Sequence, residues 1–308
     1  MSEAPATTPR EWFSAVPARR LELVRRCTFG YAVVWLVVRF AYVADVASLP
    51  ARRFEPVGVL DWMAEPPSRP LVIGVWLVTL VACGVVTLDR GVRLAAPVGA
   101  FGMLVLATVT SSYGQVFHTE HLLVLHLLVL AVGVLVEPPA RPGGETSGWP
   151  LNLMMAIVVV TYVLAGVAKL RWSGVEWVTG DVLQNWIAID NLRKLLFDDL
   201  YSPIGGWLSS IGWVWLPVAV LTLVVELGAP LALVPGRVRT LWLVVAWSFH
   251  VGVFTLMAIS FPYQLCGIAY LAFVRPEVWE RRLRSRATRV LRPGVAARVT
   301  FRSYDANS

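Results

Sequence analysis

The residue with the clearest capacity for chemistry is a lysine that closes a long apolar run. Residues 161–170 read TYVLAGVAKL, and Lys169 is one of only two lysines, with Lys194, among 27 lysines and arginines. A lysine amine can lose its proton when it is removed from water, whereas an arginine guanidinium effectively cannot. A site that needs a base therefore has a reason to keep lysine at position 169. The structural alternative is a helix-end lysine whose ammonium reaches the lipid headgroups.

Five further ionisable side chains lie at or within the apolar segments. They are Arg39, His121, His126, Glu226 and His250. An ionisable group inside a membrane needs a partner or a task. We therefore expect Arg39 to face the interior and to find a carboxylate or a carbonyl group. Glu226 and His250 lie on consecutive apolar segments and could form an interior polar pair with a structural role.

The histidines do not have the spacing of a metal site. Five positions along a helix correspond to about 140°, so His121 and His126 cannot face one point. His118 would neighbour His121 only if that helix began early. The chain has no HExxH motif, no Cys/His spacing typical of zinc and no GxSxG nucleophile elbow. We expect no bound metal and no serine-hydrolase chemistry.

The composition indicates which elements must position these residues. Hydrophobic residues make up 57% of the 308 positions, charged residues only 15%, and there are 14 tryptophans. A mean hydropathy of +0.65 is too high for a soluble domain. The net charge of +7 does not point to nucleic acid, because the basic residues lie at the termini and in short connections between apolar runs. The sequence predicts a multi-pass membrane protein.

The apolar runs predict an all-α, polytopic membrane bundle of seven or eight transmembrane helices. The predicted spans are 28–48, 71–88, 94–110, 121–136, 151–170, 211–234 and 238–259, with 264–274 as a tilted eighth span or a re-entrant piece. Residues 171–210, between the fifth and sixth spans, mix tryptophans and aspartates and predict amphipathic, interfacial helices. The predicted organisation is a basic N-terminal segment (1–26), a transmembrane domain (27–275) and an arginine-rich tail (276–308).

The distribution of arginines predicts the orientation in the cell membrane. The segment 1–26 holds five arginines, and we expect it to form a surface helix behind a disordered tip; the tail from Arg275 holds nine and should rest on anionic lipid. With eight spans, both termini are cytoplasmic. Arg52 and Arg53 in the first outer loop weakly oppose this assignment. Lys169 then lies on the non-cytoplasmic side, together with His118 and His121.

The residues around Lys169 resemble a known membrane family. The matching positions are Tyr162, the pair Ala165 and Gly166, Lys169 with Leu170, and downstream Trp177, Val178 and Gly180. This pattern is similar to that of the horizontally transferred transmembrane (HTTM) group of bacteria and of the membrane domain of vitamin K-dependent gamma-glutamyl carboxylases. The resemblance extends to Glu120 and His121, and more loosely to Phe249 with His250 and to Phe261 with Pro262.

The resemblance implies a specific chemistry. Lys169 would be the base that deprotonates a reduced quinone of the vitamin K type, and oxygenation of the resulting anion would give a strong base that removes a glutamate γ proton before carbon dioxide adds. His121 would hydrogen-bond the quinone, and Tyr162, Trp177 and His250 would belong to the cofactor site. No metal is implied.

Two departures from the carboxylase pattern affect the expected substrate. Little more than the arginine tail follows the last predicted span, where the animal carboxylase has a large domain for its protein substrate. The spacer between Lys169 and Trp177 is also longer. The acceptor of this lyase-like chemistry would be an exported peptide or a small molecule. The alternative is a non-enzymatic membrane partner in the maturation or export of a secreted peptide, as in the sporulation-delaying protein B type.

Overall fold

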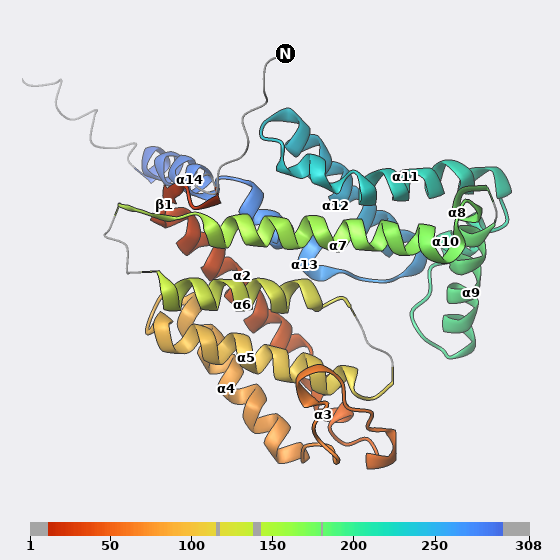
Figure 1. Cartoon of the computed structure of the whole chain (residues 1–308), viewed down its shortest axis with the longest axis horizontal. Helices are drawn as coiled ribbons and strands as arrows, with labels where there is room; N and C mark the ends of the chain where they lie inside the picture. The colour runs from red at the N-terminus through yellow and green to blue at the C-terminus, as the bar shows by residue number, and fades with distance from the viewer. Residues whose placement is uncertain (1–11, 115–117, 138–142, 180, 292–308) are drawn as a thin grey trace, which may run out of the picture.

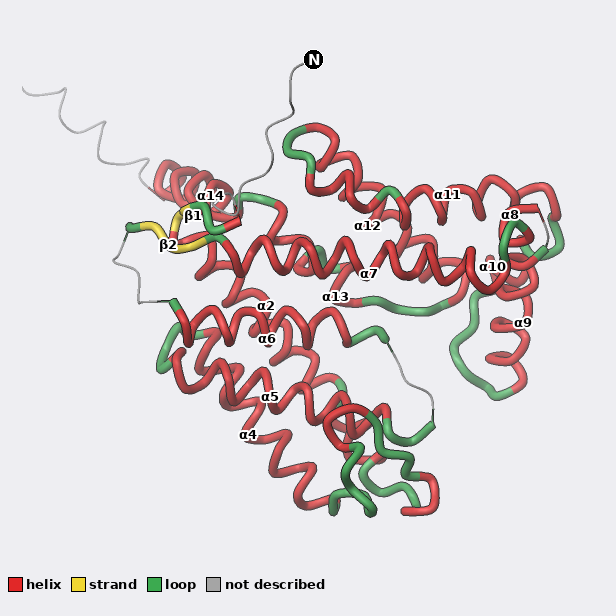
Figure 2. The backbone as a smooth tube through the Cα atoms, in the orientation of Figure 1, coloured by secondary structure: helices red, strands yellow, loops and turns green. Residues whose placement is uncertain are grey.

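Helices form almost every element of the structure. The computed structural model describes residues 12–114, 118–137, 143–179 and 181–291. Within them, Figure 2 shows only two short strands, β1 (Ala15–Pro17) and β2 (Glu145–Ser147), which pair antiparallel with Val16 opposite Thr146. The expected all-α class is confirmed.

The first half of the chain builds one group of long helices. Its elements are α2 (Ala18–Val38), α3 (Phe40–Val46), η1 (Ala51–Arg53), η2 (Gly58–Leu60), α4 (Arg69–Thr87), α5 (Val92–Ser111) and α6 (His121–Val136). Helix α2 begins ten residues before the predicted first span, so the arginines of residues 19–26 occupy its first turns. The separate surface helix expected in 1–26 is therefore wrong where the structure describes it; the expected disordered tip lies largely outside the described residues.

The second half adds two long helices and a series of short ones. Its elements are α7 (Trp149–Ser173), α8 (Glu176–Thr179), α9 (Val182–Leu196), α10 (Pro203–Leu208), η3 (Gly212–Val214), α11 (Trp215–Leu227), η4 (Ala229–Leu233), α12 (Arg237–Met257), α13 (Pro262–Leu265), η5 (Ile268–Phe273) and α14 (Pro276–Leu291). Residues 171–210 thus do form the short helices expected after α7. The predicted eighth span is divided between α13 and η5, whose Tyr263 and Ala269 are buried. Irregular backbone is tolerated at membrane depth when protein covers it.

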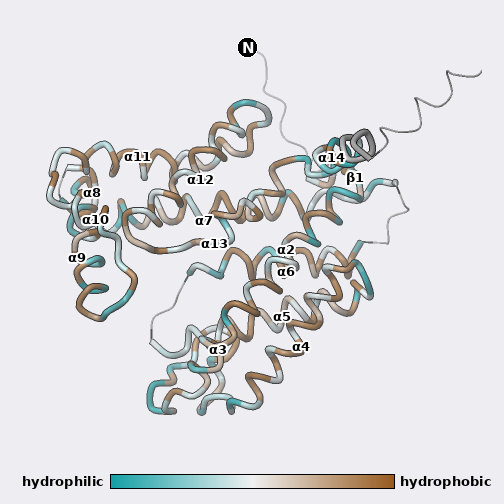
Figure 3. The backbone as a smooth tube through the Cα atoms, turned by 180° about the vertical axis from the view of Figure 1, so that it is seen from behind, coloured by the Kyte–Doolittle hydropathy of each residue, from teal (hydrophilic) through white to brown (hydrophobic). Residues whose placement is uncertain are grey.

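The helices run side by side between two ends of the molecule (Figure 1). Strand β1 and helix α14 lie at one end, and α8, α9 and α10 lie at the other. Figure 3 shows hydrophobic residues along the helices, with hydrophilic residues gathered in the loops at the ends. On α4, the outward-facing Leu77, Val78 and Val81 are 53–58% exposed. Large apolar side chains left open along a helix are expected where lipid covers them.

Among the described residues, four helices are long and apolar enough to cross a membrane. They are α4, α5, α7 and α12, and a fifth crossing results if α2 and α3, bent by 61° at Arg39, form one span. Helix α6 and the stretch Gly212–Leu227 are apolar but shorter. The structure is compatible with a multi-pass membrane protein.

Small residues bring the helices close together. On α5, a Cβ atom added to Gly102 would lie 2.0 Å from the Thr79 Oγ1 atom of α4, and one added to Gly99 would lie 3.0 Å from Cys83 Sγ. Close approach through small residues is the usual packing mode where lipid removes the hydrophobic drive between helices.

Candidate functional site

A glycine on α7 positions the lysine of the candidate site. A Cβ atom added to Gly166 would lie 2.8 Å from Leu227 Cδ2 and 3.1 Å from Glu226 Cβ, both on α11. Only glycine lets α11 approach α7 this closely. Lys169 follows three positions later, on the same face of α7. The glycine therefore brings the carboxylate of α11 beside the amine of α7.

Lys169 and Glu226 form a buried ion pair. Lys169 Nζ donates to Glu226 Oε1, and the side chains are 21% and 4% exposed. Glu226 Oε2 is buried without a hydrogen-bond partner. The expected pair between Glu226 and His250 does not form. Glu226 accepts from Lys169, and His250 hydrogen-bonds with Tyr162 instead. Sequence periodicity alone did not fix which faces of α7, α11 and α12 meet.

Helix α8 closes the other side of Lys169. After α7, the chain turns at Gly174, whose φ of +56° favours glycine. The turn brings back Trp177, whose ring centroid lies 5.2 Å from Lys169 Nζ. Trp177 is buried, and its Nε1 donates to Thr222 Oγ1 of α11 at 3.2 Å. The ammonium thus lies between a carboxylate and an aromatic face, both of which stabilise its charge.

Tyr162 lies at the centre of a second group of polar side chains, farther along α7 from the end that carries Lys169. It lies seven positions before Lys169 on α7, so it shares the face that packs on the C-terminal helices. Its hydroxyl is 2.7 Å from His250 Nε2 and 2.7 Å from the Tyr270 hydroxyl. His250 Nδ1 is buried without a partner. We refer to Tyr162, His250 and Tyr270 as the tyrosine–histidine cluster.

His121 lies in a pocket on the group of helices formed by the first half of the chain. The pocket, of about 390 Å³, is bounded by η2, α5 and α6 and is lined by Val57, Gly58, Leu104, Ala107, Thr108, Ser111, His121, Val124 and Leu125. Lys169 is not among its lining residues. The volume is within the range of small-molecule sites, roughly 300–1,000 Å³. The walls are apolar apart from the imidazole and two hydroxyl groups, so the pocket suits an apolar molecule with one or two polar atoms.

His118, to which the sequence analysis assigned no role, lies between the two regions. Its ring centroid lies 5.5 Å from that of Phe261, which in turn lies 4.9 Å from that of His250. Desolvation lowers the pKa of His118, and the charges of His121 and Lys169 lower it further, against an opposing effect of Glu120. His118 is thus near enough to Lys169 for the charge of Lys169 to affect its pKa. The signal for it in the sequence was its place in a loop without Lys or Arg.

Arg39 has the carboxylate partner that was expected. Its guanidinium lies 3.6 Å from Glu120 Oε1, which also accepts from Trp35 Nε1 at 3.4 Å. The expectation that Arg39 faces the interior is wrong, because its side chain is 46% exposed; the residue lies at the break between α2 and α3 rather than within a continuous helix. His126 has a structural environment, since it is fully buried and its Nδ1 lies 2.8 Å from the Tyr263 hydroxyl.

Within the described residues, no group of three or more histidine, cysteine, aspartate or glutamate side chains could hold a metal ion. Comparisons with protein-family models, with curated proteins and with solved structures find no match to this chain. The site must therefore be interpreted from its own geometry.

Proposed function

We propose that this protein is a membrane enzyme in which Lys169 deprotonates a reduced quinone, as in the vitamin K-dependent carboxylases and the HTTM group that its sequence resembles. One observation carries the proposal. The amine near the end of α7 is only 21% exposed and is paired with a buried carboxylate whose second oxygen has no partner. An ionisable group within a membrane segment is by default a candidate functional residue.

The pair gives Lys169 a way to act as a base. In the proposed reaction Glu226 takes one proton from Lys169 Nζ, which leaves a neutral amine beside a neutral carboxyl group. The amine then accepts the hydroxyl proton of the quinol, and the products are an ammonium group and a quinolate anion. The ring of Trp177 stabilises the ammonium.

The remaining residues give the proposal its binding elements. A quinol combines an apolar body with two hydroxyl groups, which matches the walls of the His121 pocket. His121 would hydrogen-bond the ring oxygen there. Tyr162 and His250 of the tyrosine–histidine cluster do not line that pocket; they would contact the cofactor on the Lys169 side. The acceptor would be an exported peptide or a small molecule.

The proposed arrangement in the membrane has eight passages of the chain. Helix α6 and the segment α11–η4 add two crossings to the five long ones, and α13 with η5 forms an irregular eighth passage. The described chain begins and ends at the same end of the molecule (Figure 1), as an even number of passages requires. We place that end, with its arginines, in the cytoplasm, and Lys169 at the outer face of the cell membrane.

The test is quinol turnover by the purified protein in detergent. Wild type should bind a reduced naphthoquinone and convert it to the epoxide in the presence of oxygen. Lys169→Ala and Lys169→Arg should bind the quinol without turnover, because neither side chain can take its proton. The matched control is Lys194→Arg, which changes the only other lysine, bonded to the Met257 carbonyl oxygen and to Asp190, and should leave turnover intact. Turnover retained in Lys169→Ala contradicts the proposal.

A second candidate is a non-enzymatic partner in the maturation or export of a secreted peptide. Helix α9 favours it, because Ile189, Leu192 and Leu196 form one apolar face that is 56–74% exposed, on the side opposite its bonds to α12. Such a face could hold an apolar peptide. If no variant and no wild-type sample consumes quinol, this candidate replaces the first, and Lys169 becomes a helix-end lysine.

A further inference from the structure

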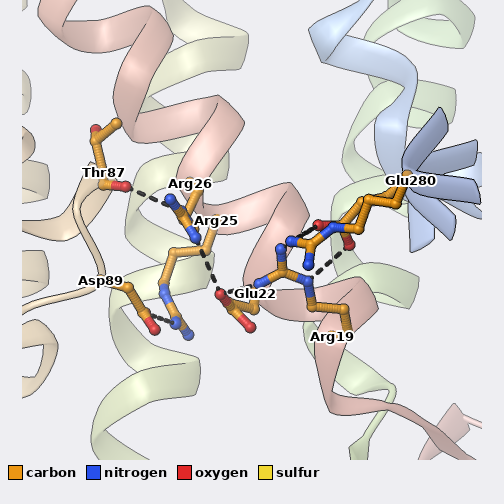
Figure 4. A network of polar contacts seen from close by, with 8 residues as sticks. Arg19, Glu22, Arg25, Arg26, Thr87, Asp89 and Glu280 are labelled. Atoms are coloured by element: carbon orange, nitrogen blue, oxygen red, sulfur yellow. Dashed lines mark hydrogen bonds and ion pairs between the residues drawn. The ribbon is translucent and has the colours of Figure 1, made fainter. Parts of the chain in front are cut away.

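Ion pairs attach the C-terminal helix to the N-terminal helix. Arg19 Nε donates to Glu280 at 2.8 Å, and Arg20 donates to Glu277 at 2.8 Å. Figure 4 shows that the same stretch of α2 also reaches the α4–α5 connection. There Arg25 pairs with Asp89 at 2.7 Å and Arg26 donates to a backbone carbonyl oxygen at 3.0 Å. Helix α14 is thus fixed in position.

The attached helix runs across the end of the bundle. In Figures 1 and 3, α14 is seen nearly end-on, whereas α6 and α7 lie along the picture. A helix that crosses the end of a group of membrane helices lies parallel to the membrane surface. Its position along the bundle axis matches that of the helix ends, where the lipid headgroups are.

The faces of α14 differ sharply in chemistry. Glu277 and Glu280, three positions apart, face α2. Trp279 and Leu283, four positions apart, share another face and are 51% and 65% exposed. The exposed Arg282 lies about 60° around the helix from Trp279 and about 100° from Leu283, whereas the exposed Arg281 lies about 160° or more from both. A tryptophan and a leucine flanked by an arginine form the surface of an interfacial helix.

We propose that this surface of α14 binds the anionic lipid leaflet at its end of the bundle. Trp279 and Leu283 enter the boundary between headgroups and acyl chains, and Arg282 binds a phosphate group. Trp12 and Phe13, 43% and 59% exposed, precede β1 at the same end of the molecule and add apolar side chains there. The charge and the position both match lipid: Arg282 complements anionic headgroups, and the ion pairs keep the helix level with them. This inference does not depend on the proposed function.

Spin-label depth in nanodiscs tests the proposal with the full chain. In a background where Cys27, Cys83 and Cys266 are replaced by alanine, a label is attached at Leu283→Cys or at Ser285→Cys, two positions and therefore about 200° further around the helix. In nanodiscs containing phosphatidylglycerol, the label at 283 should lie about 5–10 Å below the headgroup surface. The label at 285 should remain accessible to a water-soluble nickel complex. Equal accessibility of both labels to the nickel complex overturns the proposal.

A second measurement uses the natural cysteines. Phosphatidylglycerol retained by the protein is counted by native mass spectrometry for wild type, for Arg282→Gln and for Arg52→Gln. The last variant is a control that removes another exposed arginine, in η1. The α14 variant should retain less of this lipid than both wild type and the control. Equal retention by the two variants shows that α14 does not bind anionic lipid, and an acidic protein partner would then be the alternative.

Discussion

The ion pair of Lys169 and Glu226 should respond unequally to the loss of either partner. Lys169→Met leaves a carboxylate that is 4% exposed and has no other hydrogen-bond partner. Removing one partner of a buried pair costs about 3–5 kcal/mol, since the remaining charge is stranded. Glu226→Gln instead leaves an ammonium that is 21% exposed and still faces Trp177. That loss should be nearer the value of one charge-assisted hydrogen bond, about 1–3 kcal/mol.

Equilibrium unfolding in mixed micelles of a mild detergent and dodecyl sulfate measures these differences. We expect Lys169→Met to lower the free energy of unfolding by about 2 kcal/mol more than Glu226→Gln, the difference between the two ranges above. The double variant should be less destabilised than the sum of the singles, because it strands no charge. If Glu226→Gln is the more harmful change, or if the two single effects add, the pair is not the buried unit described above.

Three further predictions follow from other parts of the structure. A hydrogen bond from Arg19 of α2 lowers the pKa of Glu280 to about 2, so the contribution of this pair to the attachment of α14 should be complete above the usual carboxyl pKa of 4.5 and be lost as the pH falls towards about 2; spin-label distances between α2 and α14 check this, and Glu280→Gln should leave only the pH dependence that the Arg20–Glu277 pair contributes. Gly102→Ala places a Cβ atom 2.0 Å from a threonine hydroxyl of α4 and should cost about 1–3 kcal/mol in the unfolding assay, whereas Gly74→Ala meets open space and should not destabilise. Tyr162→Phe removes a hydroxyl that bonds two buried groups and should cost about 1–3 kcal/mol, against little change for the exposed Tyr201→Phe.

The long helices could be predicted because apolar length is a strong local signal. The bounds predicted for the fourth span, 121–136, are those of α6. The start of α2 was missed because its first turns are rich in arginine, and a sequence gives no sign that glutamates some 260 positions later will neutralise them. The predicted eighth span could not be resolved for a similar reason: its apolar residues form short helical turns that are buried by contacts with segments distant in the sequence.

The sequence indicated which residues belong to the candidate site, but not which of them contact one another. Lys169 stood out by the rarity of lysine, and Glu226 by its charge inside an apolar run. Their pairing depends on the rotation of α7 against α11, which Gly166 decides by allowing close approach. The small residue three positions before Lys169 was the available clue. His118 was passed over because its proximity to Phe261 arises from two loops distant in the sequence.

The attachment of α14 to α2 has a consequence for biosynthesis. Helix α2 leaves the ribosome first, yet it packs against η5 and α14, which are made last. Arg20 of α2 and its partner Glu277 are 257 positions apart, and Arg19 and Glu280 are 261 positions apart. At a synthesis rate of 5–20 residues per second, these glutamates are therefore made roughly 13–52 s after the arginines. During that interval Arg20 lacks Glu277, and Arg19 pairs only with Glu22 of its own helix. A chain whose synthesis stops before residue 276 would keep these arginines without their partners in α14, so its N-terminal end would differ in charge from that of a finished copy.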